Sequence, residues 1–398
     1  MCGICFITKS KFFRFDSIVF SICRLTPSPF DGVVRTSRRA FSVIISPRRG
    51  LLLTLQGRRL PVKKGTVVGG PVASIGLEAS DQLEVMRLHV DAALEALVEH
   101  EREQGAGQVA DLCASMLLAG GKRLRPLLIL LAHEIAGGED IDEVMPLALA
   151  FELIHTATLV HDDINDEAAL RRGVQTIHTR AGLAKAVIAG DWLFVQGFGL
   201  GGRYEEHIVR LMAKCCADIA VAEFHQLDHV LNLATSPEDY LSIVRGKTAG
   251  PFSAGCHAAG LVAGLDEEQA AGLGRFGMEL GVAFQLVDDL LDLRGDDRMG
   301  KPRGADVIEG KMTLPLIHAL TLSHGDERQK LAHIIEHFTD DQFDQLMELL
   351  NRSESLKYAE LLVRTHLERA VLELDAFPPS RAKDLMLHIT GYVMERHL

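Results

Sequence analysis

Residues 152–173 place three aspartates in a stretch whose other residues are mostly apolar and helix-forming. Asp162, Asp163 and Asp166 stand at positions i, i+1 and i+4, so one helical turn brings the first and the last onto the same face. Carboxylates crowded in this way repel one another unless a cation lies between them. Hard oxygen ligands of this kind suit Mg²⁺ that is shared with substrate phosphates. The stretch therefore predicts a magnesium site, although a charge run on a helix is more often a solvated face.

A second triad repeats this spacing in residues 284–292, which are otherwise almost all apolar. Asp288, Asp289 and Asp292 would stand on one helix as the first triad does. A buried or half-buried acid costs several kcal/mol unless it is paired or metal-bound, so six acids on two apolar helices favour a functional role. We expect the two triads to face each other and to hold a diphosphate through Mg²⁺.

Four bases are candidates for binding the anionic part of a substrate. Arg171 and Arg172 follow the first triad within about two turns, and a planar guanidinium matches phosphate oxygens. Lys122 and Arg125 lie in the sequence GGKRLRP, where two glycines free the backbone to bend and Pro126 suits the start of a helix. Bases at a helix start are unfavourable for its dipole, so this pair indicates an anionic partner. Two solvated surface bases are the alternative.

Charge is divided unevenly along the 398 residues. Of the 42 Lys and Arg, 13 lie in residues 1–75, which leaves 29 for the rest; of the 54 Asp and Glu, 2 lie there, which leaves 52. Such an acidic body disfavours nucleic acid as a partner and favours bound cations.

The seven cysteines are scattered and lack zinc-type spacing, which fits a reducing, cytoplasmic location. No run approaches the roughly 18 to 20 uninterrupted apolar residues of a spanning helix, so any membrane contact is expected to be peripheral.

Residues 1–75 differ from the rest, with Arg pairs beside Ser, Pro and Gly and with neither a helical nor a strand period. Three interpretations compete: an organellar transit segment, a flexible basic arm, or sequence read from upstream of the true start. The third is preferred because the segment is long and compositionally foreign. We therefore expect residues 1–75 to be a basic extension of low order and residues 76–398 to form the folded domain.

The pattern from residue 80 onward is helical and rich in Ala, Leu, Glu and Met. Ser80 is the expected N-cap of the first helix, and Gly250 with Pro251 is expected to break or kink a later one. Helices are expected over residues 80–97, 108–118, from 126, 145–167, 182–197, 211–233, from 237, 265–292, 316–320, 327–337, 340–350, 353–374 and from 380. Residues 294–315 are expected to form a loop. Strand alternation and internal repeats are missing from the sequence, so the predicted fold class is all-α.

Five segments in this order resemble motifs of the trans-isoprenyl diphosphate synthase (polyprenyl synthetase) family: GGKRLRP, ELIHTATLVHDDINDEAALRRG, GKTAG, FQLVDDLLD and GKPRGADVIEGKMTLP. The resemblance covers residues 80–398 and includes both triads. It implies a helical bundle of the isoprenoid synthase type around a central cavity, and a homodimer. It also implies an Mg²⁺-dependent prenyltransferase that condenses isopentenyl diphosphate head-to-tail with an allylic prenyl diphosphate. Contact with a membrane would be at most peripheral, through the lipid product.

The resemblance assigns metal-binding roles to the six aspartates. About three Mg²⁺ per active site would hold the allylic diphosphate between the triads. Direct ligands would be Asp162, Asp166 and Asp288, while metal-bound waters or neighbouring groups would be held by Asp163, Asp289 and Asp292.

The resemblance assigns the bases and two polar residues to the two substrates. Arg171 would bind the allylic diphosphate, and the charge that grows as its C–O bond breaks would be neutralised by Lys247, Lys301 and Lys311. Isopentenyl diphosphate would be held by Lys122, Arg125, His155 and Arg172. Thr248 and Gln285 would line the developing allylic cation. Simpler roles remain open for some of them: a core histidine for His155, a solvated base for Lys311, and helix packing for Thr248 and Gln285.

Product length depends on the floor of the hydrocarbon pocket. In the family this floor is formed by the side chains four and five residues before the first aspartate, which here are Thr158 and Ala157. Both are small, so a product beyond about C15 is expected from pocket volume, with C30 to C50 favoured and C20 still open. Alternatively, the small pair merely lets two helices pack.

Three rival functions share parts of this pattern. A non-catalytic subunit of a heterodimeric prenyltransferase would be expected to lack triad acids or diphosphate-binding bases, and none is lost here. A class I terpene cyclase would have less need of GGKRLRP. A di-iron carrier would need a second ExxH besides Glu152 and His155, and the other expected helices lack one.

Overall fold

The computed structural model describes residues 41–46, 50–55, 58–59, 78–295 and 303–395. The chain divides into two compact units, Met1–Ser74 and Ile75–Leu398. In the first unit, strands β1 (Phe41–Ser46), β2 (Gly50–Leu55) and β3 (Arg58–Arg59) pair antiparallel in the order β1-β2-β3. The sequence pattern predicts no strand in residues 1–75. Short continuous apolar runs show no alternation, so periodicity alone misses strands of this kind.

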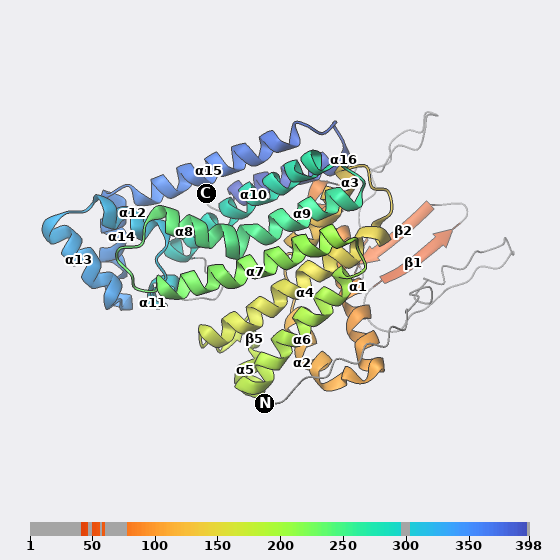
Figure 1. The fold of residues 1–398 in the computed structure, drawn as a ribbon, viewed down its shortest axis with the longest axis horizontal. Helices are drawn as coiled ribbons and strands as arrows, with labels where there is room; N and C mark the ends of the chain where they lie inside the picture. The colour runs from red at the N-terminus through yellow and green to blue at the C-terminus, as the bar shows by residue number, and fades with distance from the viewer. Residues whose placement is uncertain (1–40, 47–49, 56–57, 60–77, 296–302, 396–398) are drawn as a thin grey trace. The chain divides into compact units, whose positions relative to one another are not determined.

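The second unit is built almost wholly of helices (Figure 1). In chain order they are α1 (Ala79–Glu101), α2 (Gly107–Leu117), α3 (Leu124–Ile135), α4 (Ile141–Asn165), α5 (Ile177–Ala181), α6 (Leu183–Gly201), α7 (Glu206–Asp228), α8 (Pro237–Val244), α9 (Gly250–Val262), α10 (Glu267–Arg294), α11 (Ala305–Ile308), α12 (Leu314–Leu322), α13 (Gly325–Glu336), α14 (Phe343–Arg352), α15 (Ser355–Leu374) and α16 (Arg381–Glu395). The π-helical turns η1 (Arg102–Ala106) and η2 (Arg245–Ala249) join α1 to α2 and α8 to α9, and a 3₁₀ turn, η3 (Asp340–Gln342), precedes α14. A short hairpin, β4 (Leu170–Arg171) and β5 (Val174–Gln175), follows α4. The all-α prediction is confirmed.

The helices that carry the two triads, α4 and α10, belong to the core. Helix α4 packs against α3 and α6, and α10 packs against α9 and α15. Figure 1 shows α4 beside α6 and α9 beside α10. Buried apolar side chains cover most of the circumference of α4 and α10, as expected of helices enclosed by neighbours. The core therefore holds both triads in fixed positions at the C-terminal ends of these two helices.

Several helix boundaries differ from expectation. The first helix begins at Ala79 with Glu78 at its N-cap, so Ser80 lies inside the first turn. Gly250 and Pro251 do not break the chain of helices, because they open α9 directly after η2, and a proline in the first turn needs no partner for an N–H. The expected loop before residue 315 contains the short helix α11.

Two helices, α4 and α6, are long and apolar enough to cross a membrane, judged by length and composition. Neither is an uninterrupted apolar run, since Glu152 lies in α4 and both Lys185 and Asp191 lie in α6. In α4, 67% of the most apolar stretch is buried inside the protein, as in the core helix of a soluble protein. In α6 the buried share is 28%, so an apolar face of this helix is exposed.

Candidate active site

A cavity of about 420 Å³ lies between the C-terminal turns of α4 and α10 and the segment 305–313. Asp162 and Asp166 line it from α4, and Asp289 lines it from α10. Asp306 and Glu309 add two further carboxylates. Members of both triads therefore face one acidic cavity.

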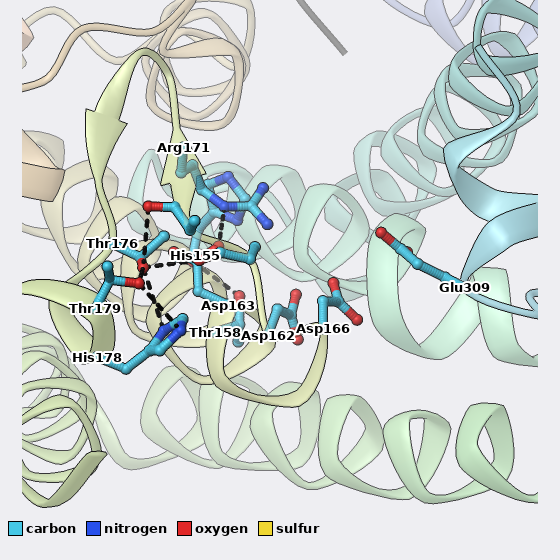
Figure 2. Close-up of polar contacts among 12 residues, drawn as sticks. His155, Thr158, Asp162, Asp163, Asp166, Arg171, Thr176, His178, Thr179 and Glu309 are labelled. Carbon is cyan, nitrogen blue, oxygen red and sulfur yellow. Dashed lines mark hydrogen bonds and ion pairs between the residues drawn. The ribbon is translucent and has the colours of Figure 1, made fainter. Parts of the chain in front are cut away.

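Asp162 and Asp166 lie one turn apart at the end of α4, and each faces a lysine. Lys247 Nζ is 3.5 Å from Asp162 Oδ1, and Lys311 Nζ is 3.4 Å from Asp166 Oδ2. Burial raises the pKa of Asp162, and the charge of Lys247 opposes this rise. Figure 2 shows Asp166 projecting toward Glu309. These two carboxylates are open to the cavity and suited to a hard cation.

Asp163 is directed to the arginine hairpin rather than to the cavity. Its carboxylate oxygen Oδ1 accepts a hydrogen bond from Arg171 Nε, as Figure 2 shows, and its side chain is 1% exposed. The second oxygen, Oδ2, is buried and has no hydrogen-bond partner among the described residues. Burial raises the pKa of Asp163, whereas the ion pair with Arg171 lowers it. Asp163 therefore fixes the position of Arg171 and does not itself face the cavity.

The hairpin β4–β5 positions both arginines. Arg172 has a left-handed backbone conformation, with a φ of 51°, in the tight turn between the strands. The buried Thr176 hydroxyl fixes the base of the hairpin by donating to the Ala168 carbonyl oxygen at 2.7 Å. Arg171 lines the cavity, while Arg172 Nη1 donates to the Gly120 carbonyl oxygen at 2.6 Å. The two adjacent arginines thus serve different parts of the site.

Asp289 is the centre of a hydrogen-bond chain on α10. Its carboxylate accepts from the Tyr240 hydroxyl at 2.5 Å and from Gln285 Nε2 at 2.8 Å. Gln285 Oε1 in turn accepts from the Thr248 hydroxyl at 2.8 Å. Burial, and after it the neighbouring Asp306, raises the pKa of Asp289 to about 8. The chain holds Thr248 and Gln285 side by side on the cavity wall.

The other two acids of the second triad, Asp288 and Asp292, are half-buried. Asp292 Oδ2 accepts a hydrogen bond from the backbone N–H of Asp306 at 3.1 Å, which ties the end of α10 to the segment 305–313. Within the described part of the chain, no three His, Cys, Asp or Glu side chains converge closely enough to hold a metal ion. A metal ion bound to these acids would therefore take further ligands from substrate oxygens or water.

Two lysines bridge acids across the cavity. Besides Asp162, Lys247 Nζ meets Glu223 Oε2 of α7 at 2.5 Å, and besides Asp166, Lys311 Nζ meets Glu309 Oε2 at 2.5 Å. Burial lowers the pKa of Lys311, but the neighbouring carboxylates outweigh burial and raise it overall. The predicted site residue Lys301 lies outside the described residues.

A narrow crevice beside the cavity is lined by Arg125, His155, Thr158 and Lys247. The Arg125 guanidinium lies over the Phe252 ring, 4.6 Å from its centre, and burial lowers the pKa of Arg125 to about 10. Burial also lowers the pKa of His155 far below its ordinary value, and the surrounding arginines, Arg125 first, add to this shift. Lys247 lines both the crevice and the cavity, so it stands where the two meet.

Lys122 lies apart from the crevice lining. Its side chain is exposed, with Nζ 5.1 Å from the centre of the Tyr392 ring on α16. Arg125, His155 and Arg172 interact electrostatically with one another, whereas Lys122 is exposed on the loop before α3.

Of the two small residues expected under the substrate, only one lines the crevice. Thr158 lines the crevice, whereas Ala157 is fully buried and does not line it. The wall continues along α4 with Ile154 and Phe151, which helical rise places about 6 and 10 Å beyond Thr158. Bulky side chains therefore begin one turn beyond Thr158.

Four residues of the site are not singled out by the sequence pattern: Tyr240, Glu223, Asp306 and Glu309. The last two lie within the GADVIEGK segment, where two acids beside Lys311 are the available signal. Tyr240 and Glu223 carry no local motif, because α8 and α7 bring them to the site only through packing.

Comparison with known proteins identifies the same protein family by sequence and by structure. The family model described as polyprenyl synthetase matches residues 107–350, more than half of the chain. The chain is 32% identical over 324 residues to the geranylgeranyl diphosphate synthase of Methanosarcina mazei, across 79% of this chain and 97% of that protein. A decaprenyl diphosphate synthase from Rhodobacter capsulatus has a similar structure, with a TM-score of 0.74 and 35% identity over 80% of this chain and 99% of the other. A polyprenyl synthase from Caulobacter crescentus, solved with calcium and isoprenyl diphosphate, has a TM-score of 0.74 and 33% identity over 80% and 98%.

Proposed function

We propose, because this chain belongs to the polyprenyl synthetase family, that it makes polyprenyl diphosphates longer than C20. Its reaction class is that of the family: it is a prenyltransferase that condenses isopentenyl diphosphate head-to-tail with an allylic prenyl diphosphate and releases diphosphate. The predicted reaction class is thereby confirmed. One observation connects that class to this chain's own residues: an acidic cavity and a basic crevice meet at Lys247.

The two substrates divide between these regions. The allylic diphosphate occupies the acidic cavity, where Arg171 and Lys311 bind its oxygens. Isopentenyl diphosphate lies against Arg125, His155 and Arg172, whose guanidinium groups suit phosphate and whose imidazole is neutral. Lys247 then lies between the leaving diphosphate and the incoming carbon chain.

The donors of the cavity fit Mg²⁺. Carboxylates from α4 and from α10 line one space, yet too few converge for a complete shell, which is the arrangement in which Mg²⁺ shares substrate phosphates. Asp162 and Asp166, which line the cavity, would hold the ions, and the family resemblance adds Asp288, which does not line it. When bound, Mg²⁺ supplies charge neutralisation at the diphosphate. The Caulobacter crescentus relative was solved with calcium, another cation that prefers oxygen ligands.

The residues of this chain act on each bond change in turn. The bond between the allylic carbon and diphosphate oxygen breaks, and Lys247 stabilises the negative charge that grows on that oxygen. Thr248 and Gln285 turn polar oxygens to the allylic cation while their mutual hydrogen bond keeps them in place. The double bond of isopentenyl diphosphate attacks the cation to form the new C–C bond. A proton then leaves the adjacent carbon for the released diphosphate, and apolar walls exclude water that would quench the cation.

The proposed product length is supported by the wall of α4, along which the allylic chain would extend past Lys247 from the cavity toward Thr158. Thr158 is small and leaves room beneath the allylic chain, and Ile154 and Phe151 follow on α4 as the next bulky groups. A floor lower than Thr158 admits more isoprene units before the chain meets a side chain.

Product analysis tests this function. The enzyme is incubated with Mg²⁺, radiolabelled isopentenyl diphosphate and either geranyl or farnesyl diphosphate, and products are resolved by length. We expect the wild type to form products beyond C20, Thr158→Phe to stop at C15 to C20, and Thr158→Ser to match the wild type. Removal of Mg²⁺ with EDTA should stop incorporation. Wild-type products ending at C20 contradict the chain length, and no incorporation with any starter contradicts the activity.

The assembly is proposed to be a homodimer joined through α6 and α7. These packed helices expose a run of apolar side chains: Leu183, Val187, Ile188, Val195, Val221, Phe224 and Leu227. An exposed apolar surface spread over two neighbouring helices is typical of an interface. The resemblance to the family names a second copy of the chain as the occupant.

A further inference from the structure

Arg123 lies in the loop between α2 and α3 with its side chain turned inward. That side chain is 1% exposed, whereas the neighbouring Lys122 is exposed to solvent. The backbone of Arg123 has a φ of 50°, a left-handed conformation that is unfavourable for a residue with a Cβ. Gly120 and Gly121 just before it have φ values of 96° and 146°. The loop is therefore bent so that Lys122 points out and Arg123 points in.

The guanidinium of Arg123 connects three helices. Nη1 donates to Glu152 Oε1 on α4 at 2.6 Å, and Nε donates to Asp91 Oδ1 on α1 at 2.8 Å. Nη2 donates to the Leu117 carbonyl oxygen at the end of α2 at 2.5 Å. A planar fork with fixed donors can meet three acceptors at once, which a lysine ammonium cannot do in this geometry. Arg123 thus anchors the loop before α3 to helices α1, α2 and α4.

Glu152 is a buried carboxylate whose charge acts on both Arg125 and Arg172. It is 3% exposed and lies one turn before His155 on α4. Its charge supports the protonated forms of Arg125 and Arg172, against the burial that lowers the pKa of each. Loss of this charge would leave the half-buried Arg125 and the more exposed Arg172 without the carboxylate that offsets their mutual repulsion.

The side chain of Arg172 is coupled to the backbone of the same loop. Arg172 Nη1 donates to the Gly120 carbonyl oxygen at 2.6 Å. A Cβ placed on Gly121 would lie 3.2 Å from the central guanidinium carbon of Arg172, so the guanidinium rests directly on the loop. A shift of this loop would therefore move Lys122 and Arg125 and displace Arg172 with them.

We infer that Arg123, held by Glu152 and Asp91, is a positioning residue for the isopentenyl diphosphate site. The inference deepens the proposed function and rests on it, since it concerns the second substrate of that reaction. Arg123 acts through Arg125 and Arg172 and does not itself bind substrate. The allylic side is held by other means.

The allylic side depends on contacts outside this network. Arg171 is held by Asp163, and Lys311 is held by Asp166 and Glu309. A fault in the Arg123 network should therefore weaken binding of one substrate and spare the other. A purely structural ion pair would not separate the two substrates.

Three substitutions in the full-length enzyme test this: Glu152→Gln, Arg123→Lys and Asp91→Asn. Initial rates are measured with each substrate varied separately, and thermal unfolding is measured for every variant. We expect the KM for isopentenyl diphosphate to rise about tenfold in the first two, comparable to losing one charge-assisted hydrogen bond. Asp91→Asn should raise it about threefold, because Asp91 is partly exposed and shared with Arg87. The KM for the allylic diphosphate should change less than about twofold in all three.

Glu279→Gln is the matched control. Glu279 is a partly buried glutamate on α10 whose Oε2 lies 2.6 Å from His366 Nδ1, away from the loop. It should leave both KM values within about twofold of wild type. The inference is overturned if the KM for isopentenyl diphosphate is unchanged, if both KM values rise together, or if activity only follows the loss of folded protein.

Two safeguards keep these outcomes separate. If Glu152→Gln does not fold, Asp91→Asn decides, since it leaves the buried Arg123–Glu152 pair intact. If the wild type incorporates no isopentenyl diphosphate, the proposed function fails, and this is seen before any variant is compared.

Discussion

The charge state of His155 follows from its neighbours rather than from its own chemistry. Burial and the surrounding arginines hold its pKa far below the ordinary value, so the imidazole is neutral at physiological pH. A neutral imidazole offers one N–H donor and one acceptor. It can therefore bind a diphosphate oxygen without adding a further cation to a crowded basic crevice.

This burial also links His155 to the pH dependence of stability. In the unfolded chain histidine titrates near 6.5, whereas folded His155 stays neutral well below that pH. Below pH 6.5 the unfolded state binds a proton that the folded state does not, so stability is complete above this pH and is lost as the pH falls. We expect the free energy of unfolding to fall more steeply between about pH 6.5 and 5 in wild type than in His155→Gln. Urea denaturation across this range measures the difference, and equal slopes would show that His155 does not titrate in this way.

Close packing of α10 against η2 and α9 positions the polar pair at the cavity. A Cβ added to Gly281 would lie 2.6 Å from Ala249 Cα, and one on Gly277 would lie 2.5 Å from the Phe252 carbonyl oxygen. Glycine at these positions lets the backbones approach closely. The approach sets Thr248 of η2 against Gln285 of α10.

Gly281→Ala should force η2 away from α10. We expect a loss of about 1 to 3 kcal/mol in the free energy of unfolding, because an added methyl here overpacks the core. The separation of Thr248 from Gln285 should also lower kcat more than it changes either KM. Gly391→Ala is the control, since a Cβ there meets no atom within 4 Å and should stabilise α16 by about 0.5 to 1 kcal/mol. Wild-type stability and kcat in Gly281→Ala would contradict the close-packing argument.

Subunit assembly depends on the exposed face of α6. Val195 is 66% exposed there, so an aspartate should be tolerated in a monomer but not in an apolar interface. We expect Val195→Asp to reduce the mass measured by light scattering from two chains to one. Leu372→Asp on α15 is the matched control, because Leu372 is also 66% exposed, and it should remain dimeric. A wild type that is already monomeric, or a Val195→Asp variant that stays dimeric, rejects this interface.

The second unit, Ile75–Leu398, should fold and catalyse the reaction without the first unit. All the described residues of the cavity and the crevice lie within Ile75–Leu398. A fragment of residues 75–398 should therefore fold and keep kcat and both KM values within about twofold of the full chain. Thermal unfolding and steady-state kinetics of the fragment measure this. A fragment that is insoluble or inactive would show that residues 1–74 contribute to the folded enzyme.

The sequence by itself determined the elements and the reaction class. Helical periodicity is local, so it revealed most helices of the second unit, and the two triads with five ordered motifs identified the prenyltransferase chemistry. Helix boundaries differ from the pattern, because caps and turns depend on a few atoms: Ser80 is not the N-cap, and η2 replaces the expected break. The strands in residues 41–59 were missed because apolar runs without alternation carry no period.

Only the tertiary structure decided which way each acid and base of a motif points. Asp162 and Asp163 are adjacent in sequence, yet Asp162 faces the cavity, whereas Asp163 faces away from it and binds Arg171. Tyr240 reaches Asp289 from α8, Glu223 reaches Lys247 from α7, and Asp91 reaches Arg123 from α1, so each contact comes from another helix. The physical reason is that spacing along one helix determines only a shared face. Hydrogen-bond partners, burial and pKa shifts depend on what the other helices bring to that face.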